Sequence, residues 1–252
     1  MYSRDLYKGQ VALITGGNGG IGSALVSAFL EHGATVIAVD LGSESKVDHP
    51  NLTFETLDVT DIGAIHALTQ RITARHGRID VLINAAGIVA SGSAAAISEA
   101  SWDRVLDINL KGTFFTCQAV LESMKKNCYG RIINLGSVLG KNGGNPRPWI
   151  DPSEQDKAGN IAYGVSKAGV HALTAYLAKE LASHGITVNA IAPGPIASAM
   201  TTSFPETLRN LIPVGRMGTA DEVCTATLFL ASRQSSFITG EILDVNGGLW
   251  VD

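Results

Sequence analysis

Tyr163 and Lys167 are the two residues whose types and spacing most directly suggest catalysis. They lie four residues apart in YGVSK, so on a helix both side chains would project from one face. A phenol has a pKa of about 10 and is a poor base at neutral pH, but a neighbouring ammonium group stabilises the phenolate and lowers that pKa. The pair predicts proton transfer with Tyr163 as general acid or base, although this spacing alone is common.

A glycine-rich turn, TGGNGGIG at residues 15–22, predicts the binding of a pyrophosphate. It follows an apolar run and opens a helical pattern, which is the context such a motif requires. Glycines let the backbone approach the phosphates, and the helix N-terminus offers N–H groups and a positive dipole end. The turn fits three glycine spacings at once. A phosphate-loop nucleotide hydrolase is disfavoured because no Lys-Ser or Lys-Thr pair follows the glycines.

Two acidic residues at strand ends indicate which dinucleotide is bound. Asp40 lies 18 residues after Gly22, where a carboxylate can accept both adenosine ribose hydroxyls and repels a 2′-phosphate. No Arg or Lys occupies positions 17–22 or 41–45, so we expect NAD(H) rather than NADP(H). Asp58 ends the third expected strand, where it and the Val59 backbone are candidates to hold the adenine amino group.

Short apolar runs alternate with helical patterns along the whole chain. The expected strands are 11–16, 34–40, 52–59, 80–87, 130–137, 186–194 and 241–248. Apolar spacing near 3.6 predicts helices over 23–33, 62–77, 101–124, 162–185 and 221–232. This alternation predicts an α/β fold with a doubly wound parallel sheet of about seven strands, a Rossmann fold with helices on both faces, forming a single domain over 1–252. Ligands of such sheets bind at the carboxyl ends of the strands.

The combined motifs carry a family resemblance. In order they are TGGNGGIG (15–22), NAAG (84–87), Asn109 in DINLKGTF, Ser137 in INLGS, Tyr163 and Lys167 in YGVSK, PGPI (193–196) and FITGEILDVNGG (237–248). With them the chain resembles the short-chain dehydrogenase/reductase family from end to end. Extended members with T-G-x-x-G-x-x-G carry a further C-terminal domain, for which no room follows DVNGG. We therefore expect T-G-x-x-x-G-x-G, with Gly16, Gly20 and Gly22 structural and Gly17 and Gly19 incidental.

The resemblance implies the roles of four catalytic residues. Tyr163 exchanges a proton with the substrate oxygen, Ser137 hydrogen-bonds that oxygen, and Lys167 holds the nicotinamide ribose and lowers the Tyr163 pKa. Asn109 supports a water that links Lys167 to solvent. Taken alone, Ser137 would be interpreted as a strand-end serine that caps the next turn and Asn109 as a helix-interior asparagine bonded to backbone; Tyr163 and Lys167 in register favour the catalytic roles. The expected cofactor-binding residues are Gly16, Asn18, Gly20, Ile21, Gly22, Asp40, Asp58, Val59, Asn84, Ala85, Ala86, Gly87, Tyr163, Lys167, Pro193, Gly194, Ile196 and Ser198.

Several positions depart from the family pattern. Ala85 stands where a second Asn is frequent, and Ser198 where Thr is usual. The 138–162 loop is longer than the family commonly has, and it starts at the expected substrate pocket. We expect Arg147, Trp149, Asp151 or Glu154 to contribute to substrate selection or a subunit contact, and a solvated surface excursion is the alternative. Residues 195–215 are expected to form a substrate lid.

Composition narrows the class of partner. The net charge of −4 without a basic stripe disfavours nucleic acid, and the sequence has neither a secretory signal core nor an apolar run long enough to span a membrane. Three dispersed cysteines are typical of a reducing cytoplasm, and the His residues show no metal-ligand spacing, so no metal is expected. The resemblance implies a homotetramer (or homodimer) that uses helices near 101–126 and 162–184 and the C-terminal strand.

The expected activity is NAD-dependent interconversion of a secondary alcohol and a ketone. An NAD preference suits oxidation, and the polar, Trp-bearing loop suits a sugar, polyol or hydroxy acid as substrate. A 3-oxoacyl-thioester reductase is the enzymatic alternative, but that reaction typically prefers NADPH, against which Asp40 argues. A non-catalytic NAD(H)-binding sensor or scaffold is a further alternative. The natural substrate, its stereochemistry and the physiological direction stay open.

Overall fold

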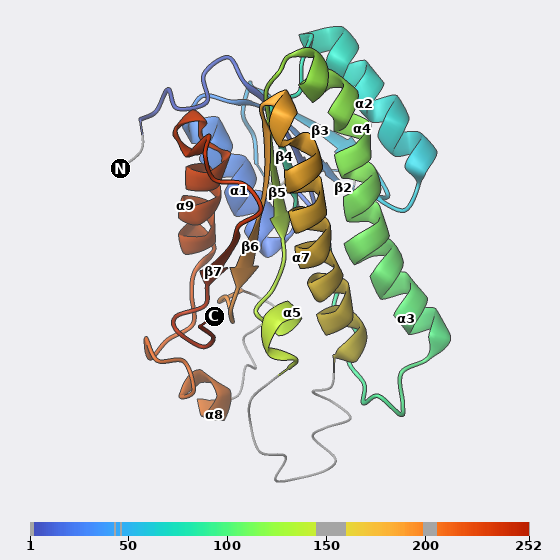
Figure 1. Ribbon diagram of the computed structural model, residues 1–252, viewed down its shortest axis with the longest axis vertical. Coiled ribbons are helices and arrows are strands. Elements are labelled where there is room, and N and C mark those ends of the chain that lie inside the picture. Colours follow the sequence, from blue (N-terminus) through green and yellow to red (C-terminus); the bar gives the residue numbers. More distant parts are fainter. Residues whose placement is uncertain (1–2, 43, 46, 145–159, 199–205, 252) are drawn as a thin grey trace.

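One seven-stranded parallel sheet forms the centre of the protein, with strand order β3-β2-β1-β4-β5-β6-β7 (Figure 1). The computed structural model describes residues 3–42, 44–45, 47–144, 160–198 and 206–251. The strands are β1 (Val11–Thr15), β2 (Thr35–Asp40), β3 (Leu52–Thr56), β4 (Val81–Asn84), β5 (Gly130–Leu135), β6 (Ile186–Pro193) and β7 (Ile242–Val245). Every neighbouring pair is parallel, so the prediction of a doubly wound parallel sheet is confirmed.

Helices cover both faces of the sheet, which explains why central strands such as β1 and β4 are buried along their whole length. In β1, Ala12 and Ile14 pack with α1 (Gly20–Glu31) and α9 (Ala220–Ala231) on one face. Val11 and Leu13 pack on the other face with α2 (Ile62–His76), α4 (Thr113–Lys126) and α7 (Ile161–Leu181). Figure 1 shows these two helical layers on opposite sides of the strands.

The helix expected over 101–124 is interrupted. It consists of α3 (Glu99–Leu106), a π-helical segment η1 (Asp107–Gly112) and α4. The hydroxyls of Thr113 and Thr116 donate to the carbonyls of Asn109 and Gly112 at 2.8 and 2.9 Å, which satisfies acceptors in and beside the widened turn. Periodicity could not separate these pieces, because one π turn leaves the apolar pattern on both sides intact.

Short elements and left-handed glycines complete the connections. The short elements are α5 (Leu139–Asn142), η2 (Ala182–His184), α8 (Glu206–Arg209) and η4 (Arg233–Ser235). Gly33, Gly77 and Gly185 have φ of 88°, 77° and 71°, so the predicted left-handed helix ends are confirmed. Among the described residues, no helix combines the length and the apolar character that crossing a membrane would need.

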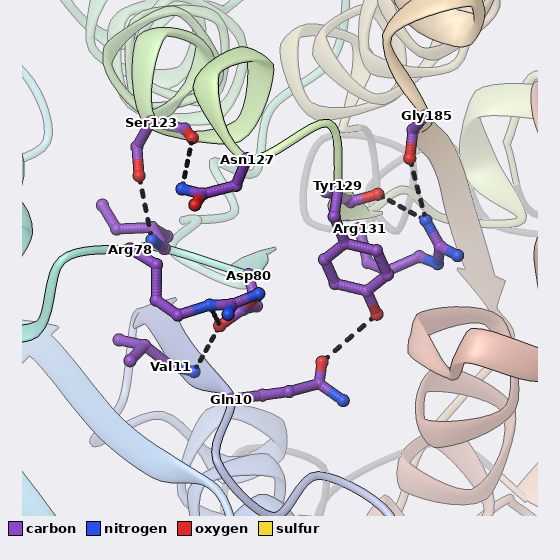
Figure 2. Close-up of polar contacts among 11 residues, drawn as sticks. Gln10, Val11, Arg78, Asp80, Ser123, Asn127, Tyr129, Arg131 and Gly185 are labelled. Carbon is purple, nitrogen blue, oxygen red and sulfur yellow. Dashed lines mark hydrogen bonds and ion pairs between the residues drawn. The ribbon is translucent and has the colours of Figure 1, made fainter.

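A buried polar network joins the segments at the amino-terminal ends of β1, β4 and β5 (Figure 2). The Asp80 carboxylate accepts from the Val11 N–H at 2.9 Å and from Arg78 Nε at 2.8 Å. The Tyr129 hydroxyl donates to Gln10 Oε1 at 3.2 Å. The Arg131 guanidinium donates to the carbonyls of Gly130 and Gly185. Since ligands of this fold class bind at the opposite ends of the strands, this network serves stability.

Candidate active site

A cavity of about 270 Å³ opens at the carboxyl ends of the strands, between the glycine turn and α7. Segments from six parts of the chain line it. Of the predicted site residues, the lining contains Gly20, Ile21, Gly22, Ala85, Gly87, Ser137, Tyr163, Lys167, Pro193, Gly194, Ile196 and Ser198. The structure therefore brings three of the four predicted catalytic residues into one cavity with the glycine turn.

The glycine turn needs glycine at positions that differ in part from those expected. Gly16 has φ of 70°, and a Cβ there would lie 2.6 Å from the Ala86 nitrogen, while a Cβ at Gly22 would lie 1.9 Å from the Gly16 oxygen. A Cβ at Gly17 would lie 2.9 Å from Ala38 Cβ of β2, so the expectation that Gly17 is incidental is wrong. A Cβ at Gly20 would meet only Ser198 Cβ at 3.6 Å, so sterics within the chain do not require glycine there.

The first turn of α1 suits an anion. The N-cap residue Gly19 supplies no side-chain hydrogen bond, and no acidic residue lies in the first turn. The opening residues Gly20–Gly22 line the cavity, so the positive end of the helix lies at it with no carboxylate of the first turn in competition. This arrangement fits the pyrophosphate of a dinucleotide.

Asp40 lies beside the glycine turn, as the sequence predicts. Its Oδ2 accepts from the Asn18 N–H at 2.9 Å and its Oδ1 from the Leu41 N–H at 2.7 Å. The Gly17 N–H donates to the Val39 carbonyl at 3.0 Å, so the turn is joined to the end of β2 twice. Each carboxylate oxygen keeps acceptor capacity toward ribose hydroxyls.

Asp58 and Val59 occupy less direct positions. The exposed Asp58 accepts at Oδ1 from both the N–H and the hydroxyl of Thr60, each at 2.8 Å. Val59 is buried, and a Cβ at Gly112 would lie 3.0 Å from its carbonyl oxygen. The adenine-binding role predicted for this pair stays a prediction.

Tyr163 and Ser137 meet in the cavity, but the acidity of the phenol differs from expectation. Burial raises the Tyr163 pKa above its ordinary value, and a hydrogen bond with the Ser137 side chain opposes this shift. Lys167 Nζ lies 5.6 Å from the centre of the tyrosine ring and donates to the Leu135 carbonyl at 2.6 Å. Burial therefore outweighs the lowering of the Tyr163 pKa that was expected from Lys167, which is not among the causes of the shift.

The ammonium group of Lys167 is itself perturbed by its surroundings. The side chain is buried, and desolvation lowers its pKa to about 8. Burial in low dielectric disfavours the charged form of a lysine. Even so, a pKa of about 8 leaves most of the ammonium charged at neutral pH, so Lys167 remains a donor in the cavity.

Asn109 is fully buried behind the cavity, in the π-helical segment. Its Oδ1 accepts from the Ile88 N–H at 2.8 Å, and its Nδ2 donates to the Ile88 carbonyl at 2.9 Å and to Ser166 Oγ at 3.0 Å. Ser166 in turn donates to the Tyr163 carbonyl at 2.7 Å. Asn109 thus joins the segment after β4 to α7, and its predicted water contact stays a prediction.

Asn84 and Ala86 are not among the residues that line the cavity. Asn84 donates to Asn134 Oδ1 at 2.9 Å and accepts from the Thr116 hydroxyl at 2.6 Å, so its side chain is engaged in the core. The Ala86 N–H donates to Thr15 Oγ1 at 3.2 Å, which joins the NAAG segment to the end of β1.

Parts of two predicted segments lie outside the described residues. Arg147, Trp149, Asp151 and Glu154 of the long loop are among them, as are residues 199–205 of the expected lid. Among the residues the structure does describe, no group of three His, Cys, Asp or Glu side chains is placed to hold a metal ion.

Sequence reasoning missed three contributors to the site. The Leu135 carbonyl is a backbone group, which no side-chain motif reveals. Ser166 and His171 were visible in principle, since they lie three and eight residues after Tyr163 on the same helix.

Comparisons with known proteins agree with this geometry. The family model described as Enoyl-(Acyl carrier protein) reductase matches residues 16–250. The chain belongs to the short-chain dehydrogenase/reductase family. It is therefore an oxidoreductase of the kind that binds a nicotinamide dinucleotide.

Relatives and a solved structure match over nearly the full chain. The 3-oxoacyl-[acyl-carrier-protein] reductase FabG of Thermotoga maritima is 40% identical, covering 96% of this chain and 98% of the relative. The protein of the same name from Vibrio cholerae is 37% identical, with 97% and 98% covered. The crystal structure of gox2181 is 33% identical, with a TM-score of 0.86 and 99% of both chains covered.

Proposed function

We propose that this protein interconverts a 3-oxoacyl thioester and the corresponding 3-hydroxyacyl thioester, with NAD(H) as its cofactor. The observation that carries the proposal is that Tyr163, Ser137 and the uncapped N-terminus of α1 share one cavity. The cavity therefore combines a proton donor for the substrate with a site for the phosphates of the dinucleotide.

The residues of the chain divide the work of carbonyl reduction. The Tyr163 hydroxyl, with its raised pKa, holds a proton at neutral pH and passes it to the carbonyl oxygen. Ser137 Oγ accepts from the Leu139 N–H at 3.2 Å, and its hydroxyl, which hydrogen-bonds Tyr163, would turn to donate to that same carbonyl oxygen when substrate binds. Lys167, which lines the cavity, would hold the nicotinamide ribose through its ammonium group. NADH, when bound, supplies the hydride, and the positive ring of NAD⁺ favours the phenolate in the reverse direction.

The substrate class is supported by the names of the relatives, several of which are 3-oxoacyl-[acyl-carrier-protein] reductases at 35–40% identity. They favour a 3-oxoacyl thioester over the sugar, polyol or hydroxy acid expected first. Oxidation of such an alcohol is the second candidate, because the Asp40 carboxylate favours NAD(H) and an NAD preference suits oxidation.

Steady-state kinetics of the purified protein test this assignment. The substrates are acetoacetyl-coenzyme A with NADH, and a panel of sugars, polyols and hydroxy acids with NAD⁺. We expect kcat/KM for the thioester to exceed that of any panel member by at least about tenfold, a difference of roughly 1.4 kcal/mol. A panel member with a higher kcat/KM than the thioester would refute this assignment and favour the second candidate, oxidation of a sugar, polyol or hydroxy acid.

Replacing Tyr163 by Phe separates an enzyme from a binding protein. Loss of the hydroxyl removes the proton donor but keeps the ring that lines the cavity, so turnover should fall by roughly 10²–10⁴-fold while NADH binding is kept. If wild-type protein binds NADH but neither it nor the variant turns over any substrate, the non-catalytic sensor or scaffold is favoured.

The proposed preference for NAD(H) over NADP(H) depends on the Asp40 carboxylate. Asp40→Asn removes the charge but keeps an oxygen that can accept from the Asn18 N–H, so the turn should stay folded. We expect the ratio of kcat/KM for NADH to that for NADPH to fall by about tenfold or more, because a neutral side chain no longer repels a 2′-phosphate. Asp58→Asn is the matched control and should leave the ratio unchanged. A wild-type preference for NADPH would refute the assignment.

The predicted assembly and compartment are part of the proposal. The exposed apolar side chains Ile161, Val165 and Tyr176 on α7 support a homotetramer or homodimer that uses this helix. The free cysteines Cys117, Cys128 and Cys224 support a reducing compartment such as the cytoplasm.

A further inference from the structure

One face of α7 contacts the end of β5 and the segment that follows it. Lys167 Nζ donates to the Leu135 carbonyl at 2.6 Å, and Thr174 Oγ1 accepts from Asn134 Nδ2 at 2.9 Å. Between them, His171 Nε2 accepts from the Ser137 N–H at 3.4 Å. Tyr163, Lys167, His171 and Thr174 are three or four residues apart, so they project from the same side of the helix. The helix that carries the catalytic tyrosine thus also supports the backbone of the catalytic serine.

The segment after β5 lies directly over the His171 ring. A Cβ at Gly136 would lie 2.2 Å from His171 Nε2, and a Cβ at Gly140 would lie 2.9 Å from its Cε1. At Gly136 the imidazole fills the space that a side chain would take. At Gly140 the backbone of α7 fills it as well, because the Cβ would lie 2.8 Å from Ala168 N. The ring supports residues 136–140 by steric contact as well as by accepting the hydrogen bond from the Ser137 N–H.

Ser137 is consequently held on two sides. Its N–H points to His171, and its Oγ accepts from the Leu139 N–H at 3.2 Å and bonds with Tyr163. The neighbouring Gly136 and Val138 N–H groups donate to the carbonyls of Ile191 and Pro193 in β6 at 2.8 and 3.0 Å. Without the imidazole the Ser137 N–H loses its acceptor, so the serine between these two bonds is less firmly placed.

We propose that His171 is a positioning residue, which sets the place of the Ser137 hydroxyl relative to Tyr163. This inference rests on the proposed function only in that Ser137 and Tyr163 serve the same reaction. His171 does not line the described cavity and acts through Ser137.

The test compares His171→Leu with His171→Gln. Leucine removes the acceptor and the ring, whereas the glutamine amide oxygen can accept from the Ser137 N–H. His184→Leu, at an exposed histidine in η2 beyond the far end of α7, is the matched control. We expect His171→Leu to lower kcat by roughly ten- to a hundredfold through misplacement of the hydroxyl, with the NADH dissociation constant unchanged. His171→Gln should recover much of the loss, and the control should equal wild type.

A double-mutant cycle decides whether His171 acts through Ser137. In a Ser137→Ala background, His171→Leu should lower kcat no further, because the group that it positions is already absent. A decrease by the same factor in both backgrounds would indicate general damage to the fold and overturn the proposal. Wild-type kcat in His171→Leu would overturn it as well.

Amide hydrogen exchange provides a readout that does not need turnover. The Ser137 amide should exchange faster in His171→Leu than in wild type, and its rate should be unchanged in His184→Leu. If wild-type protein turns over none of the substrates, the proposed function fails while this exchange result still stands for the His171 contact. Equal exchange rates in wild type and His171→Leu would refute the contact.

If His171→Leu does not fold, wild type is compared with His171→Gln instead. A loss of kcat in His171→Gln as large as the loss in Ser137→Ala would then refute the positioning role.

Discussion

At the scale of single residues, the main tension is between the charge of Lys167 and its burial. The side chain is almost fully buried, and its described hydrogen bond is to the neutral Leu135 carbonyl. Its pKa of about 8 lies below the ordinary value of 10.5 because burial disfavours the ammonium form. A shift of this size corresponds to a free-energy cost of roughly 3 kcal/mol for the charged lysine in the folded protein at neutral pH.

Replacing Lys167 by Met should therefore stabilise the fold while impairing catalysis. We expect the free energy of unfolding at pH 7 to rise by about 1–3 kcal/mol, because an apolar side chain of similar length removes the buried charge. Turnover should fall sharply because the cavity loses its ammonium group. Urea denaturation and steady-state kinetics measure the two effects.

The pH dependence of this difference has a definite sign. Between about pH 8 and pH 10.5 the unfolded chain keeps the lysine proton that the folded protein has released, so wild-type stability rises relative to the variant. The advantage of Lys167→Met should thus be largest below pH 8 and shrink toward pH 10. A variant that is less stable than wild type at pH 7, or a difference that does not vary with pH, would contradict this account.

At the scale of elements, the glycines between β1 and α1 have two roles, because some are required by the turn and others by a ligand. Gly16, Gly17 and Gly22 face protein atoms at distances that leave no room for a Cβ, whereas Gly20 faces the cavity. A sequence template treats all such glycines as one motif. The structure separates those that the turn requires from those that a ligand requires.

Two glycine-to-alanine substitutions, each of which adds one methyl group, should separate the glycines that the turn requires from those that a ligand requires. Gly17→Ala should lower the free energy of unfolding by about 1–3 kcal/mol, because its Cβ would press on Ala38 of β2. Gly20→Ala should leave stability near wild type but weaken NADH binding, because its Cβ would stand in the cavity. Thermal unfolding and NADH titration make the comparison. The division would be wrong if Gly20→Ala bound NADH like wild type while Gly17→Ala kept full stability.

At the scale of the whole molecule, the two ends of the sheet serve different purposes. The cavity and its reactive groups lie at the carboxyl ends of the strands, and the network around Asp80 lies at the amino ends (Figure 2). Asp80 is buried with 1% exposure, yet it joins β1 to the segment before β4. Its charge is tolerated because Arg78 and a backbone N–H both donate to it.

Asp80→Ala should destabilise the protein by about 3–5 kcal/mol, because it leaves a guanidinium and a buried Val11 N–H without their acceptor. Urea denaturation measures the loss. Glu55→Ala is the control, because its pair with Arg71 is partly exposed and should contribute less than about 1 kcal/mol. At temperatures where the Asp80 variant is folded, its kcat should match wild type. A lowered kcat there would show that the two ends of the sheet are coupled.

Much of the fold was predictable because its signals are local. Both faces of the central strands are covered, so these strands are apolar runs, and glycines end several helices in the left-handed conformation. The helix over 101–124 was predicted without its π-helical interruption, since carbonyls satisfied by threonine hydroxyls leave no trace in apolar spacing.

By itself the sequence determined the sheet, the glycine turn and the pairing of Tyr163 with Lys167, because each depends on residue types a few positions apart. Tertiary structure alone decided that burial raises the Tyr163 pKa, that Lys167 donates to the Leu135 carbonyl, and that His171 supports Ser137. Burial and hydrogen bonding depend on segments that are distant in the chain, and no spacing rule within one segment reports which of them will meet.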